Sequence, residues 1–187
     1  LSGCHDPHRQ SAAEQRPGFR LFNGYSDRAS ILKDGLLYQP FYYTDESFFL
    51  FAPSSRVLVV DVASDSVVDA IDAPCPGLDY ATLDEAGNMY FSSWVYAAGG
   101  AAVLDQPPTC VFEVPAAGEP GVAFSLPDLT EGREGGVMRY LGGGRALLSV
   151  LHDERFAASD APSATELTFA NNWRFWSYEL AAGQATL

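Results

Sequence analysis

The fold of this chain is decided by residues 48–71, which read FFLFAPSSRVLVVDVASDSVVDAI. Apolar and β-branched runs alternate here with the turn sequences PSS and ASD, a pattern typical of short strands. It predicts strands over 48–52, 57–62 and 66–71. Connections this short join only antiparallel neighbours. Because a single sheet of this kind cannot bury both of its faces, the pattern becomes informative where the chain repeats it.

The chain repeats the pattern of residues 56–71 twice, over 110–124 and 174–187. Upstream, residues 43–48 resemble 81–89 and 140–146. Each copy also places an acid near the end of an apolar strand, at Asp61, Glu113 and Glu179. We expect these acids to hold turns rather than to act in catalysis. Self-similarity at about 40–50 residues, with four strands per unit, indicates a β-propeller.

The sequence therefore predicts an all-β fold, a β-propeller of four-stranded antiparallel blades over about 36–71, 78–126 and 137–187. Since a closed ring needs about four to eight blades, we expect a segment of a larger propeller or ends covered by another copy. Residues 18–38 could supply an N-terminal strand that completes the last blade. No segment of useful length has convincing helical periodicity, and 157–168 is the best candidate for a helical turn.

Composition limits the possible functions. The 187 residues are 47% hydrophobic, as expected of a globular chain, and contain no apolar run long enough for a transmembrane helix. The formal charge is −13, from 24 acids against 11 bases. This balance argues against nucleic-acid binding through a general positive surface.

Residues 1–4, Leu-Ser-Gly-Cys, resemble the bacterial lipobox, in which the cysteine after the cleavage site carries lipid. On this interpretation Cys4 is lipidated, residues 1–17 form a flexible tether, and the protein meets the membrane only through its lipid anchor. The alternative is an ordinary cysteine in a tail. Export to the cell envelope would allow Cys75 and Cys110 to form a disulfide, and two buried thiols are the alternative.

Strand parity predicts where the connections lie. Long connections over 72–77, 95–109, 127–136 and 152–172 should gather at one end of the sheets. The short turns, 45–47 among them, should gather at the other end. Long loops on a rigid scaffold usually carry function.

The long-loop end is rich in arginine and aromatic residues, which together suit a flat anionic ligand. The candidate ligand-binding residues are Trp94, Tyr96, Arg133, Arg139, His152, Arg155, Trp173 and Arg174. The alternative is that the tryptophans pack between sheets and the arginines pair with the many acids. The sequence shows no catalytic or metal-binding motif, and Ser149, His152 and Asp153 lie too close in sequence for a triad.

Residues 57–71, VLVVDVASDSVVDAI, resemble the repeat of YVTN-type β-propellers, and residues 48–51 take the place of the YVTN strand itself. The lipobox, the repeats and the segment 171–176, NNWRFW, together resemble propeller lipoproteins of siderophore-dependent iron uptake in myxobacteria and Bacteroidetes. That resemblance implies a cell-surface protein that captures ferric siderophores for an outer-membrane receptor.

We therefore expect a non-enzymatic lipoprotein, without a cofactor, that binds a small anionic ligand such as a ferric siderophore on its long-loop face. One alternative is a protein-interaction scaffold in the envelope. A weaker one is a hydrolase or quinoprotein-like enzyme whose catalytic residues lie outside this sequence.

Overall fold

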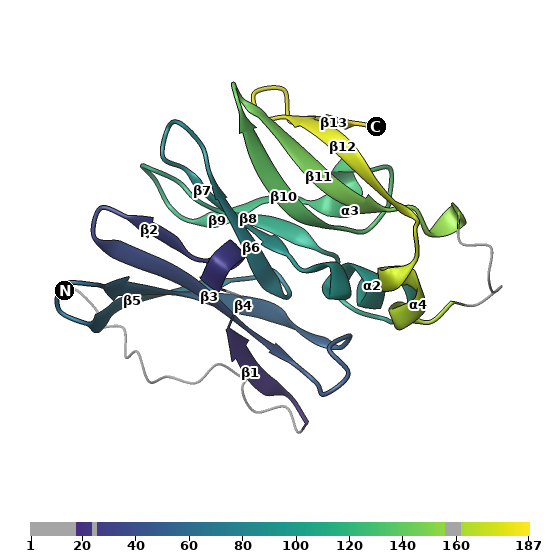
Figure 1. Cartoon of the computed structure of the whole chain (residues 1–187), viewed down its shortest axis with the longest axis horizontal. Helices are drawn as coiled ribbons and strands as arrows, with labels where there is room; N and C mark the ends of the chain where they lie inside the picture. The colour runs from purple at the N-terminus through teal and green to yellow at the C-terminus, as the bar shows by residue number, and fades with distance from the viewer. Residues whose placement is uncertain (1–17, 24–25, 156–161) are drawn as a thin grey trace.

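The structure is a computed structural model that describes residues 18–23, 26–155 and 162–187. Its strands form three antiparallel sheets that follow one another along the chain and lie side by side (Figure 1). The all-β expectation is therefore confirmed at the level of antiparallel sheets. None of the helices in the described ranges is both long and apolar enough to cross a lipid bilayer.

The first sheet has the order β1-β3-β4-β5. Both β1 and β2 pair with the same edge of β3, β1 with residues 41–44 and β2 with residues 36–38. Its strands are β1 Arg20–Asn23, β2 Ile31–Lys33, β3 Leu36–Thr44, β4 Phe51–Asp61 and β5 Ser66–Ala73, with the short helix α1 Ser26–Ala29 between β1 and β2.

The second and third sheets are simple four-stranded meanders in sequence order. The second contains β6 Leu78–Leu83, β7 Met89–Ser93, β8 Cys110–Val114 and β9 Gly121–Ser125. The third contains β10 Gly135–Gly142, β11 Arg145–Leu151, β12 Trp173–Glu179 and β13 Gln184–Thr186. The connections carry helices α2 Val95–Val103, α3 Leu126–Leu129 and α4 Ala164–Phe169, and the 3-10 helix η2 Asp153–Arg155.

The predicted turn at residues 53–55 is wrong, because β4 runs through it without a break. The register with β3 pairs Tyr42 with Ser55 and Thr44 with Phe51, so β4 has extra residues at this point. Pro53 lies in this irregularity, where no backbone N–H is needed for the ladder. A proline that reads as a turn in the sequence is therefore accommodated inside a strand.

The alignment of residues 43–48 with the other repeats is also wrong. This segment connects β3 to β4, whereas 81–89 and 140–146 contain the turns β6–β7 and β10–β11. The true counterpart is the β2–β3 hairpin, whose turn residues Asp34 and Gly35 have φ of 52° and 80°. Two such residues form the type I′ turn that suits a two-residue hairpin. The first sheet therefore begins at Arg20, and residues 18–38 complete this sheet and not the last one.

Among the described residues, two of the three hydrophobic core clusters lie between consecutive sheets, and the third joins the first sheet to the start of α2. Adjacent residues of β7 point to opposite sides, so Phe91 packs toward the first sheet and Tyr90 toward the third. Val57 of β4 is buried in the first core, and Leu148 and Trp176 of the third sheet are buried in the second. Within the described residues, the middle sheet therefore has both of its faces covered by other sheets.

The long connections gather at one end, as predicted from strand parity. The Gln106 side chain accepts a hydrogen bond from the Phe51 backbone at 2.7 Å and donates to the Phe49 carbonyl. The Thr109 backbone and hydroxyl donate to Glu134 at 2.9 and 2.7 Å. Burial nevertheless raises the pKa of the Glu134 carboxyl. The turn at 45–50 belongs to this end too, which corrects its predicted place among the short turns.

Helix α2 was not predicted, because the sequence VYAAGGAAV lacks an amphipathic pattern and contains two glycines. Both glycines are buried and allow close packing. A Cβ at Gly99 would collide with Thr168 of α4, and one at Gly100 with the Phe49 carbonyl. Thr168 Oγ1 has no hydrogen-bond partner in the described structure, which fits a contact made by packing alone.

We expect Gly99→Ala to lower the free energy of unfolding by about 1–3 kcal/mol, because the added methyl group forces α2 away from α4. Urea denaturation followed by circular dichroism measures this change. The control is Gly121→Ala, since a Cβ there has open space around it. Equal stability of the two variants would contradict the tight α2–α4 contact.

Candidate functional site

The start of α2 lies in an aromatic cluster at the long-loop end. The Trp94 ring is buried and lies 4.0 Å from the Tyr96 ring, measured between centroids, in a stacked arrangement. Tyr42 and Phe51 of the first sheet approach the same indole at 6.2 and 6.4 Å. Of the predicted ligand-binding residues, Trp94 therefore forms part of the core, as in the alternative interpretation.

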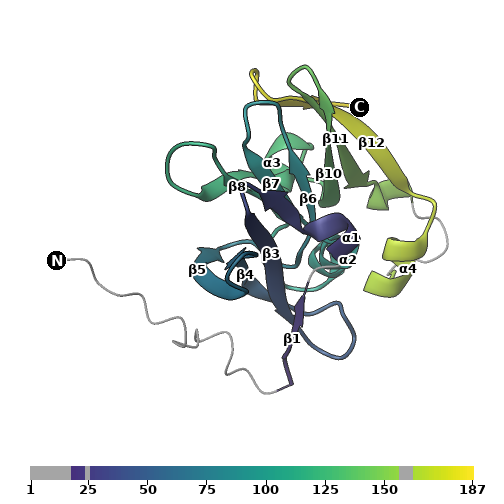
Figure 2. The same cartoon turned by 60° about the vertical axis from the view of Figure 1, so that its left-hand side comes forward.

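A second group of residues, the Arg28–Tyr80 cluster, consists of Arg28, Asp79, Tyr80, Trp94 and Arg139. It lies where β6 meets both β3 and β10 and where α1 packs beside β6 (Figure 2). The Arg28 guanidinium carbon lies 4.7 Å from the Tyr80 ring centroid and 5.9 Å from that of Trp94. The Arg139 guanidinium carbon lies 6.0 Å from the Tyr80 centroid. Two cations thus share one aromatic ring.

Arg28 is fixed in place by Asp79, a fully buried carboxylate. Arg28 Nε donates to Asp79 Oδ2 at 3.0 Å, and Nη2 donates to the same oxygen. A buried charge of this kind requires a partner, and loss of either member of such a pair typically costs about 3–5 kcal/mol. Arg139 differs, because no carboxylate of the described residues lies within ion-pair distance of it.

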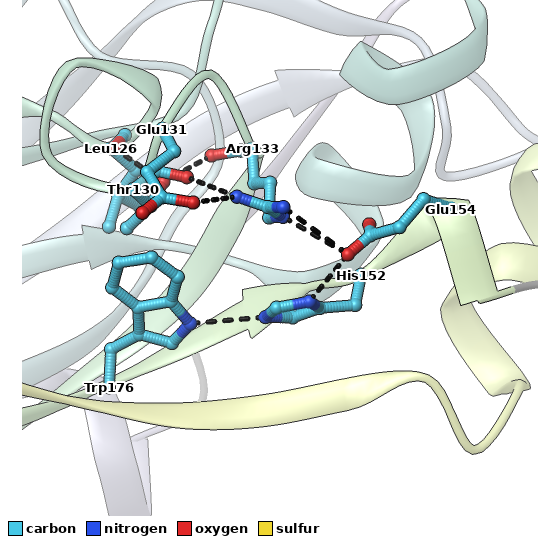
Figure 3. Close-up of polar contacts among 7 residues, drawn as sticks. All are labelled: Leu126, Thr130, Glu131, Arg133, His152, Glu154 and Trp176. Atoms are coloured by element: carbon cyan, nitrogen blue, oxygen red, sulfur yellow. Dashed lines mark hydrogen bonds and ion pairs between the residues drawn. The ribbon is translucent and has the colours of Figure 1, made fainter. Parts of the chain in front are cut away.

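His152 lies in a separate polar network at the junction of the second and third sheets (Figure 3). Its side chain is 2% exposed. Trp176 Nε1 donates to His152 Nε2 at 3.1 Å, and His152 Nδ1 lies 2.8 Å from Glu154. Because an indole nitrogen only donates, Nε2 must be the acceptor, and Nδ1 carries the proton that Glu154 accepts. The ring is therefore neutral, and both of its nitrogens are engaged.

Arg133 completes the network of Figure 3 by bridging two acids. Its guanidinium donates to Glu131 at 2.7 Å and to Glu154 at 3.3 Å. Burial would raise the pKa of the Glu154 carboxyl, but hydrogen bonds from His152 and Arg133 outweigh burial and hold that pKa below its usual range. The network ties the segment after α3 to η2, which follows β11, and to the middle of β12. Its polar atoms are satisfied by one another, so it stabilises this junction and leaves no free base at His152.

The remaining predicted residues lie around the start of β12 and η2. Trp173 Nε1 donates to the Thr168 carbonyl at 3.0 Å, and Arg174 donates to the Trp173 carbonyl at 2.8 Å. Arg155 ends η2 with an exposed side chain. The structure thus brings Trp94, Tyr96 and Arg139 to one region and Arg133, His152 and Arg155 to another.

Two of the three cysteines lie in the described residues. Cys75 and Cys110 are joined by a disulfide, with their Cα atoms 5.7 Å apart. Cys4 and the predicted tether 1–17 lie outside the described residues. Within the described ranges no group of three or more His, Cys, Asp or Glu side chains is arranged to hold a metal ion.

Comparison with protein-family models, with curated proteins and with solved structures finds no match to this chain.

Sequence reasoning missed Arg28, Asp79 and Tyr80. A signal was present, because Asp79 follows Leu78 at the start of a strand that faces a core, and a carboxylate there needs a cationic partner. The identity of that partner depends on the packing of α1 against β6, which no local pattern encodes.

We expect Trp176→Phe to lower the free energy of unfolding by about 1–3 kcal/mol, because it leaves a buried histidine nitrogen without a donor. Urea denaturation at neutral pH measures the loss. Trp173→Phe is the matched control, since the Trp173 side chain is half-buried and its indole donates to the Thr168 carbonyl of α4, so its loss should cost less. A larger loss from the control would contradict the assignment of the His152 tautomer.

Proposed function

We propose that the three sheets are consecutive blades of a β-propeller. Two observations support a radial arrangement. The two faces of the middle sheet pack against the first and the third sheet, and β6 contacts both β3 and β10. The recurring acids Asp61, Glu113 and Glu179 also fall near the end of the third strand of each meander, counting β2 as the first strand of the first sheet.

We further propose that the protein is a non-enzymatic binding protein whose ligand is small, flat and anionic. The observation that carries this proposal is the Arg28–Tyr80 cluster. It presents an exposed guanidinium, that of Arg139, beside an aromatic ring already held in place by Arg28. Arginine combines charge with planar stacking, which suits aromatic anions such as the catecholates of a ferric siderophore.

Arg139 is the residue on which binding should depend. The protein carries a formal charge of −13, so a general attraction for anions is not available to it. Selectivity must come from a local cation whose charge is not already paired. Arg28 is neutralised by the buried Asp79, and Arg133 by Glu131 and Glu154. Arg139 is the predicted ligand-binding arginine that also lies beside an aromatic ring.

The test is a titration with a ferric tris-catecholate, followed by quenching of tryptophan fluorescence. We expect micromolar binding, and we expect Arg139→Ala to weaken it about 10- to 100-fold, the value of a hydrogen bond to a charged group. Arg145→Ala is the control, because Arg145 is an exposed arginine in the β10–β11 hairpin at the short-turn end. Absence of quenching, or an equal loss in both variants, would reject this ligand class.

We also propose that the protein is anchored to the bacterial envelope through a lipid on Cys4 and passes its ligand to an outer-membrane receptor. The support is the lipobox-like sequence of residues 1–4 and the disulfide, which belongs to an oxidising compartment. In a lipoprotein-processing bacterium, we expect radiolabelled palmitate to label the wild-type protein and not Cys4→Ser. Equal labelling of both would remove the anchor at this residue.

A protein-interaction scaffold is the second candidate function. It is favoured by Phe169 and Phe175, which are 67% and 70% exposed in the third sheet and its adjoining helix. Large apolar side chains that stay exposed can belong to a protein-binding surface. Capture of a receptor without any effect of Arg139→Ala on ligand binding would favour this candidate.

A further inference from the structure

The Arg28–Tyr80 cluster contains two guanidinium groups that differ in how their charge is balanced. Arg28 donates through Nε and Nη2 to the Asp79 carboxylate. Arg139 is exposed, and no carboxylate of the described residues lies within ion-pair distance of it. Two cations and one anion leave the cluster with one net positive charge.

Arg28 and Asp79 also differ in their access to solvent. The Asp79 side chain is fully buried, whereas the Arg28 side chain is 27% exposed. A ligand placed beside Arg139 and the Tyr80 ring would come near the Arg28 guanidinium too, since that group lies 4.7 Å from the same ring centroid. It would not touch Asp79. The buried carboxylate nevertheless masks most of the Arg28 charge, because opposite charges in contact largely cancel at a distance.

The chain offers little else that would attract a second negative charge to this place. Its formal charge is −13. The cations that lie beside the Tyr80 ring among the described residues are Arg28 and Arg139. A ligand with two negative charges would therefore meet one unmasked cation and the repulsion of an acidic protein.

We propose that Asp79 determines the charge of the ligand that this site accepts. By masking Arg28, it leaves Arg139 to balance the ligand, so the site selects an aromatic group that carries a single negative charge. The inference rests on the proposed function and narrows its ligand class. A ferric tris-catecholate stays within that class, because its charge is shared among its rings and the ring that enters presents only one share. An aromatic monocarboxylate belongs to the class as well.

The experiment compares benzoate with isophthalate, which is the same ring with a second carboxylate. Binding to the whole chain is followed by NMR shifts of its amide signals at neutral pH and low ionic strength, where charges are screened least. For ligands of this size we expect dissociation constants of about 0.1–10 mM. The wild-type protein should bind benzoate at least as tightly as isophthalate, because the second carboxylate meets no unmasked cation among the described residues of the cluster.

Asp79→Asn tests the residue itself. The amide keeps the shape of the side chain and an acceptor oxygen for Arg28, but it removes the masking charge. Arg28 should then tighten binding about three- to tenfold for each negative charge of the ligand, as expected for charges that interact across a partly exposed site. Isophthalate should therefore gain about three- to tenfold more than benzoate. Loss of a purely structural role would instead weaken both ligands alike.

Asp69→Asn is the matched control, since Asp69 is an exposed acid on β5, the outer strand of the first sheet. It removes the same amount of negative charge from the protein. Because a distant surface charge is screened, the ratio of the two dissociation constants should stay within about twofold of the wild-type ratio.

The double variant Arg28→Met with Asp79→Leu keeps the proposal testable if Asp79→Asn does not fold, because apolar residues of similar size often replace a buried ion pair without loss of stability. It removes the cation and its mask together, so the ratio should stay within about twofold of the wild-type ratio. Loss of isophthalate binding relative to benzoate, or loss of both ligands, would show that the ligand needs Arg28 itself and would overturn the masking by Asp79. Circular dichroism checks the fold of each variant.

The outcomes separate this inference from the proposed function. If the wild-type protein binds both ligands and Asp79→Asn leaves the ratio unchanged or weakens both, the site exists but Asp79 does not set its charge. If the wild-type protein binds neither ligand and Asp79→Asn gains binding, the proposed function is wrong and the masking of Arg28 is correct. If neither protein binds either ligand, both proposals fail.

Discussion

The structure depends on one constraint, which is that each β-sheet has two faces and an apolar face must be covered. The alternation of side chains in β7 satisfies it most completely, because Phe91 and Tyr90 bury themselves in different cores on opposite sides of one strand. The first and third sheets obtain one buried face each from this central sheet. These two contacts, together with the aromatic cluster around Trp94, place the three sheets relative to one another.

The same packing determines the properties of the two ends. At the short-turn end, the sheets meet through polar contacts, such as that of Lys33 Nζ with the Gly87 carbonyl at 2.8 Å and those of Glu85 with Tyr140 and the Gly143 backbone. At the long-loop end they meet through helices, rings and satisfied polar networks. The Gln106 side chain accepts from one backbone N–H and donates to one carbonyl of the β3–β4 connection, as a paired strand would. His152, at the end of β11, bonds η2 through Glu154 and β12 through Trp176. A binding site at this end, or at the nearby Arg28–Tyr80 cluster, would stand on a rigid base, which reduces the entropy lost when a ligand binds.

Much of the fold could be predicted from short patterns. The second and third sheets follow directly from apolar strands separated by turn sequences, and strand parity correctly places their long connections at one end. The first sheet was harder, because Pro53 resembles a turn and only the register with β3 reveals the irregularity that accepts it. Helix α2 escaped prediction because its stability comes from close contact with α4 at Gly99, and not from an amphipathic sequence.

The candidate site could be predicted only in part. Arg139 was recognised by residue type, whereas Arg28 and Tyr80 depend on a contact between α1 and β6 that spans about fifty positions of sequence. The hydrogen-bond partners of Arg133 and His152 were likewise invisible. Residue type indicates which chemistry is available, but the tertiary structure decides which arginines already have a partner.

The bond between Cys75 and Cys110 has a practical consequence for anyone who produces this protein. It spans 35 positions of sequence, and in the chain-entropy model a loop of that size contributes about 4 kcal/mol by restricting the unfolded ensemble. That contribution is comparable to the whole net stability of many small domains, about 5–15 kcal/mol. A reducing cytosol would yield a polypeptide that lacks it and is prone to aggregate, whereas secretion into an oxidising periplasm would yield the cross-linked form.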